Sequence, residues 1–131
     1  QRAAAGGGGA ALPTIAGLTL GATRDEVVTA LGRPAGITQG DAGAVWQYPA
    51  RSLVFVVSDR DGVVAILMTG RGAGAIDGVA VGDGTSAARG RWGEPSAAQG
   101  AAWFFARSSE WGVLLRQSGD LIGLLGIGIV Q

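Results

Sequence analysis

The stretch AVWQYPARSLVFVVSDRDGVVAILMTG, residues 44–70, decides the fold. It contains three apolar runs of strand length, rich in valine and aromatic residues, which the breakers PAR and DRDG separate. Apolar runs bounded by turn residues are typical of β-strands. We therefore expect three consecutive antiparallel strands, with the Asp-Gly pair of the second breaker closing a hairpin.

A short helix is predicted just before these strands, within GLTLGATRDEVVTALGRP at residues 17–34. Thr23 and Glu26 fit a Thr-x-x-Glu capping box, and a glycine and a proline follow the last apolar residue. The helix should cover residues 24–31. A helix of this length is unstable alone in water, so its apolar side is expected to pack on the strands.

The same order of elements recurs later in the chain. Residues 17–34 are echoed by residues 78–95 in the positions of three glycines and one proline. The Trp-x-aromatic and Ala-Arg-Ser pattern of residues 46–52 returns at 103–108, and two further apolar runs follow. We interpret this order as a tandem duplication. In the second copy Ala87 replaces the capping Glu, so we expect a helix of as little as one loose turn.

These elements predict an α+β fold with two tandem repeats, each a helix plus a three-stranded antiparallel meander. The repeats are expected to join into one sheet with the short helices on one face. The predicted organisation is a flexible Ala/Gly-rich tether at 1–12, a first repeat at 13–70, a Gly-rich joint at 71–77 and a second, diverged repeat at 78–131.

The helix entry Leu-x-Leu-Gly-x-Thr-x-x-Glu-Val, the following Leu-Gly-x-Pro and the Trp-x-Tyr strand resemble the SmpA/OmlA, or BamE-like, module of bacterial envelope proteins. Two such copies over residues 14–131 resemble the BLIP-like double repeat of secreted proteins. The sequence has no cysteine, so it departs from the lipid-bearing cysteine of the first pattern and the disulfides of the second. The resemblance implies a helix-on-sheet layout, a periplasmic or extracellular location and function by protein binding.

The charged residues weigh against several classes of function. The ten basic residues are all arginine, the ten acidic residues are scattered, and the formal net charge is +0, so no basic stripe attracts nucleic acid. Without His, Lys or Cys the usual general base, nucleophile activators and metal ligands are missing. We therefore predict no enzymatic activity, cofactor or metal. A carboxylate-dependent hydrolase is a weaker alternative.

Aromatic and arginine side chains are the remaining functional signal. Aromatic residues two apart on a strand point to the same side of a sheet, and aromatic and arginine side chains are enriched in protein interfaces. The predicted partner-binding residues are Trp46, Tyr48, Arg51, Trp103, Phe105, Arg107 and Trp111. The alternative is that the aromatic residues are the core beneath the helices.

The strands are apolar on both sides, whereas a solvated sheet face would alternate with polar residues. This pattern favours a face that docks on a partner. The predicted function is a non-catalytic extracytoplasmic protein-binding module: a scaffold, an inhibitor or an accessory subunit of a larger membrane or envelope complex. The alternative is a carrier of a small apolar ligand in the cleft between the repeats. The longest apolar run, Leu121–Val130, is much shorter than the roughly 20 residues of a membrane helix, so no transmembrane span is expected.

Overall fold

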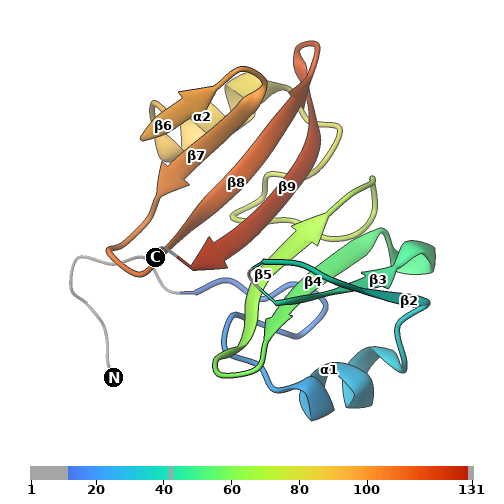
Figure 1. Ribbon diagram of the computed structural model, residues 1–131. Helices are drawn as coiled ribbons and strands as arrows, with labels where there is room; N and C mark the ends of the chain where they lie inside the picture. Colours follow the sequence, from blue (N-terminus) through green and yellow to red (C-terminus); the bar gives the residue numbers. More distant parts are fainter. Residues whose placement is uncertain (1–11, 42, 130–131) are drawn as a thin grey trace.

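A computed structural model describes residues 12–41 and 43–129 (Figure 1). The predicted tether, apart from Leu12, lies outside the described residues. The elements are α1 (Arg24–Leu31), β2 (Gly36–Gln39), β3 (Ala44–Tyr48), the 3-10 helix η1 (Pro49–Arg51), β4 (Leu53–Ser58), β5 (Gly62–Met68), α2 (Thr85–Trp92), β6 (Ala97–Gln99), β7 (Ala102–Ala106), β8 (Trp111–Ser118) and β9 (Leu121–Ile129).

All eight strands form one antiparallel sheet in the order β2-β3-β4-β5-β9-β8-β7-β6. The two halves of the chain meet in the middle, where Ala65–Met68 of β5 pair with Leu125–Gly128 of β9. The short strands β2 and β6 form the two edges. The β5–β9 pair joins the two halves of the chain, and every other pair of neighbouring strands comes from one half.

The fold class that we predicted is wrong. One continuous eight-stranded sheet dominates the structure, and only two helices of eight residues each accompany it in the described part of the chain. This is not an arrangement of two helix-plus-three-stranded repeats. The prediction missed β2 and β6, because GITQ and AAQ are short, mostly exposed segments without an apolar run. Such edge strands are recruited by pairing with a neighbour, and their own sequences carry little signal.

Helix α1 confirms the predicted boundaries of residues 24–31. The Thr23 hydroxyl accepts a hydrogen bond from the Glu26 backbone at 3.1 Å, and the Glu26 carboxylate accepts one from the Thr23 backbone at 2.9 Å. The second helix was underestimated. Residues Thr85–Trp92 complete two turns without a side-chain cap, because Ala88 and Trp92 are buried against the strands and packing replaces the missing local signal.

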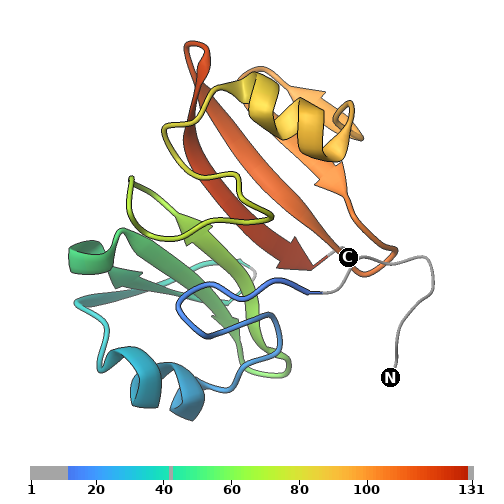
Figure 2. The same cartoon turned by 180° about the vertical axis from the view of Figure 1, so that it is seen from behind.

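One face of the sheet, which we call the covered face, carries the hydrophobic core. Its side chains form a row of directly paired residues across both halves: Trp46, Phe55, Ile66, Ile127, Val113 and Phe105. All of them are at most 8% exposed, and they form one cluster with Val27 of α1 and Ala88 of α2. Both helices therefore lie on the covered face, and Figure 2 shows α2 in front of the strands of the second half.

Candidate functional site

The first-half aromatic residues of the predicted site lie in the core. Trp46 and Tyr48 are 7% and 6% exposed, and the Tyr48 ring meets Phe55 edge-on with 5.7 Å between ring centroids. The Tyr48 hydroxyl donates a 2.8 Å hydrogen bond to the carbonyl of Gly32, the residue that ends α1. Burial disfavours the phenolate and raises the pKa of Tyr48 above its usual value near 10. Tyr48 therefore fastens the helix to the sheet.

The second-half aromatic residues are equally enclosed. Phe105 is 1% exposed and lies 5.4 Å from Trp92 and 6.2 Å from Trp103, measured between ring centroids. The guanidinium carbon of Arg89 lies 4.6 Å from the centre of the Trp103 ring, at the distance of a cation–π contact. The Trp92 indole donates a 3.0 Å hydrogen bond to the Asp77 carboxylate. These contacts attach α2 to the covered face and leave little aromatic surface for a partner.

The two arginines of the predicted site lie at opposite ends of the sheet. Arg51 is exposed in η1 between β3 and β4, and Arg107 follows β7, beside the start of β8. Arg107 is half-buried, and its Nε has no hydrogen-bond partner among the described residues. The backbone N–H of Arg107 donates a 3.1 Å hydrogen bond to the carbonyl of Trp111. Trp111 is 5% exposed, and these two residues of the predicted site are therefore neighbours. The structure thus spreads the predicted site over the core and both ends of the sheet.

The other face of the sheet, which we call the open face, carries a second set of apolar side chains. No helix packs on it among residues 12–41 and 43–129, because both helices belong to the core cluster of the covered face. Eight apolar side chains of this face are half-buried: Val45, Val54, Val56, Ala65, Leu67, Phe104, Leu114 and Leu124. Within the central strands β4, β5, β9 and β8, the polar side chains on this face are Ser58 near one end and Arg116 and Ser118 near the other.

Three glycines, at positions 112, 126 and 128, keep the centre of the open face low. A Cβ built on Gly112 would lie 2.6 Å from Phe104 Cε1 and closer still to Cζ, and one on Gly126 would lie 2.6 Å from Leu67 Cδ2. Leu114 Cδ1 is 3.2 Å from the corresponding point on Gly128. The large side chains therefore pack over glycines of neighbouring strands, and the apolar surface that results is broad and nearly flat.

Sequence reasoning missed these open-face residues. The signal was present in LVFVV and VVAILM, where the residues between the core positions are also apolar. That pattern was recognised as a docking face, but the binding residues were then assigned to the aromatic side chains. Since large aromatic residues are as typical of cores as of interfaces, residue type could not choose between the two faces.

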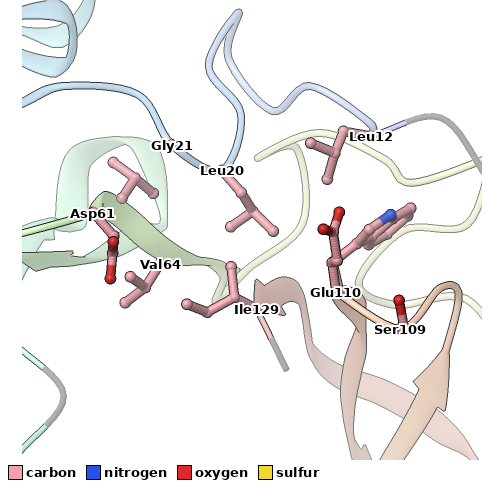
Figure 3. Close-up of a pocket in the computed structure, with 10 residues that line it drawn as sticks. Leu12, Leu20, Gly21, Asp61, Val64, Ser109, Glu110 and Ile129 are labelled. Carbon is pink, nitrogen blue, oxygen red and sulfur yellow. The ribbon is translucent and has the colours of Figure 1, made fainter. Parts of the chain in front are cut away.

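Two adjoining hollows lie where the turn before β5 meets the end of β9. The first is on the open face, beside Val56, Ala65 and Leu114, and the second is beside the core residues Leu20, Val63 and Trp111. One has a volume of about 610 Å³ and is lined by residues that include Asp41, Arg60, Leu114 and Ile129. The other, of about 440 Å³, is lined from both halves of the chain. In Figure 3, Asp61 and Val64 lie on one side of it and Ser109 and Glu110 on the other, with Ile129 between them. Asp61, Val64 and Ile129 line both hollows.

The charges around these hollows are mainly negative. Three carboxylates, those of Asp41, Asp61 and Glu110, line them together with one arginine, Arg60. Within residues 12–41 and 43–129, no group of three His, Cys, Asp or Glu side chains is placed to hold a metal ion. None of the helices in the described ranges is long and apolar enough to cross a membrane.

Comparison with known proteins identifies fold neighbours only. No protein-family model matches the sequence, and no curated protein is significantly similar to it. A DUF4309 family protein (YjgB) from Bacillus subtilis shares the fold with a TM-score of 0.57 and 12% identity over 82% of this chain and 78% of that chain. An extracellular protein containing a SCP domain from Bacillus anthracis gives a TM-score of 0.56 and 12% identity over 83% of this chain. This chain spans 43% of the length of that protein. Neither neighbour is described as BamE-like or BLIP-like, so that resemblance stays a prediction.

Proposed function

We propose that this protein is a non-catalytic, extracytoplasmic protein-binding module whose partner docks on the open face of the sheet. The observation that carries the proposal is the half-buried apolar set on that face, which no helix covers in the described part of the chain. A solvated face of an antiparallel sheet normally alternates polar with apolar residues. Here the central strands offer valine, leucine and glycine instead, which is typical of a surface that becomes buried.

The chemistry of the side chains supports a role without catalysis. The sequence has no His, Lys or Cys, and its carboxylates at positions 41, 59, 61 and 120 lie in turns between strands. Solvated turns stabilise carboxylates without preparing them for proton transfer. An extracytoplasmic location is supported by the description of one fold neighbour as extracellular. A scaffold, an inhibitor and an accessory subunit of an envelope complex all fit this proposal.

The proposal is tested by cross-linking the protein to its neighbours in its native source and then isolating it. Leu114→Glu and Val54→Lys place charges on the open face, whereas Val28→Glu changes a 37% exposed residue of α1 and serves as the control. A stoichiometric protein partner should be retained by the wild type and the control and lost by both open-face variants. If the open-face variants fold normally and keep every partner, the proposed surface is wrong.

A carrier of a small apolar ligand is a second candidate, because one hollow is lined from both halves of the chain. Its apolar part is Leu12, Leu20, Val63, Val64, Trp111 and Ile129. A volume of about 440 Å³ falls within the range of small-molecule sites. Native mass spectrometry of the protein isolated from its source would detect a retained small molecule. A protein that carries no added mass under these conditions would contradict this candidate.

A further inference from the structure

We infer that the occupant of the open face is a second copy of this chain, packed face to face with the strands of the two sheets running in opposite directions. This inference rests on the proposed function, because it names the partner for the same surface. Three properties of the open face support it: the kinds of side chain, the area, and the distribution of charge between its two ends.

The side chains of the open face are those of the inner face of a β-sandwich. A directly paired row crosses both halves of the sheet and consists of Val54, Leu67, Gly126, Leu114 and Phe104. Sheets that pack face to face lie about 10 Å apart and interdigitate medium-sized apolar side chains. Because the larger side chains lie over the three central glycines, a second sheet can approach across the whole width.

The area of the face is sufficient for a stable dimer. Eight strands spaced about 4.8 Å apart give a sheet roughly 38 Å wide. The central strands have six to nine residues, which at about 3.3 Å per residue gives a length of at least 20 Å. The resulting footprint is roughly 760 Å² per copy by these spacings. Stable interfaces bury about 800 Å² on each partner.

The charges of the open face differ between its two ends, and this difference selects the orientation. Asp41 and Asp61, with Arg60, line the open-face hollow where β5 begins and β9 ends. Arg116 of β8 lies near the opposite end, because its direct partner Leu124 is near the start of β9. The loops at that end add three exposed charged residues, Arg51, Arg71 and Asp120.

Two limiting orientations exist for two copies related by a two-fold axis in the plane between the sheets. With the axis along the strands, the acidic ends meet, and Asp41 and Asp61 of each copy face the same two carboxylates of the other. With the axis across the strands, each acidic end meets the Arg116 end of the other copy. Opposite charges that meet across an interface favour one partner and one register, so the second orientation is expected.

The test is sedimentation analysis of the full chain over a range of protein concentrations. The wild type should be a dimer, and Leu114→Glu and Val54→Lys should each raise the dissociation constant at least about 100-fold, because each dimer would bury two unpaired charges. The control Val28→Glu lies on α1 and should leave the dissociation constant unchanged. A wild type that stays monomeric, or a dimer that tolerates both open-face substitutions, overturns the inference.

Charge reversal tests the orientation in the same experiment. Arg116→Glu and Asp61→Arg should each weaken the dimer about tenfold, and the double variant should recover most of the lost affinity. If the losses of dimer affinity in the two single variants simply add in the double variant, the antiparallel arrangement is overturned. The proposed function is tested separately. If the wild type is monomeric and Leu114→Glu abolishes binding of a different protein, the proposed docking function stands and only the inference of a second copy is refuted.

Discussion

Raising the pH above about 10 should destabilise this protein through a single side chain, that of Tyr48. The sequence contains one tyrosine and neither lysine nor cysteine. Arginine as a residue type keeps its proton to above about pH 12, and an α-amino group loses its proton near pH 8. Between about pH 9 and 12, Tyr48 is therefore the only side chain expected to titrate.

The direction of the effect follows from the burial of the phenol. Tyr48 is 6% exposed and donates to the Gly32 carbonyl, and burial raises its pKa in the folded protein above about 10, the value in an unfolded chain. Stability is therefore complete below pH 10. It falls as the pH rises toward the folded pKa, because the unfolded chain loses the proton first. The free energy of unfolding should decrease by at most about 1.4 kcal/mol at pH 11.

Urea unfolding at pH 8, 9, 10 and 11, with the phenolate absorbance recorded in parallel, measures both quantities. Tyr48→Phe is the matched variant. It should cost about 1 kcal/mol at pH 8 through the lost hydrogen bond, and its stability should then be nearly constant to pH 11. An equal alkaline loss in wild type and variant would refute this reasoning, as would a wild type whose stability does not change.

Four further substitutions test the packing of the sheet and of its helices. Gly126→Ala should destabilise the protein by about 2 kcal/mol or more, because its Cβ would meet the Ile66 carbonyl and Leu67. Gly128→Ala should destabilise it less, because only Leu114 must move. Thermal unfolding of the two variants measures the difference. Phe105→Ala should cost about 3–5 kcal/mol in urea unfolding, because a ring that is 1% exposed leaves a cavity. Thr23→Ala removes the N-terminal cap of α1 and should cost about 1 kcal/mol, measured by urea unfolding at neutral pH.

Local patterns were sufficient to predict the elements with strong signals of their own. The capping box of Thr23 and Glu26 located α1, because hydrogen bonds within four residues decide where a helix begins. The apolar runs between breakers located β3, β4 and β5 for the same reason. The edge strands β2 and β6 were missed, because segments of three or four mostly exposed residues become strands only through their neighbour.

The candidate site shows a different limit of sequence reasoning. The two-residue period of a strand correctly grouped Trp46 with Tyr48 and Trp103 with Phe105 on one side. It could not tell which side the helices cover, since the intervening residues of β4 and β5 are apolar as well. From the pattern of hydrophobic residues alone, either face of the sheet could therefore have been the core and the other the candidate docking surface.

By itself the sequence determined the bounds of α1, the positions of β3, β4 and β5, the division of these strands into two faces and the absence of His, Lys and Cys side chains. Only the tertiary structure decided that the two halves of the chain pair through β5 and β9 in one sheet, and that both helices pack on the covered face. The physical reason is that capping and alternation act between residues close in the chain. The pairing of β5 with β9 and the burial of one face depend on contacts between residues about 60 apart, such as Ile66 with Ile127, and no local pattern encodes them.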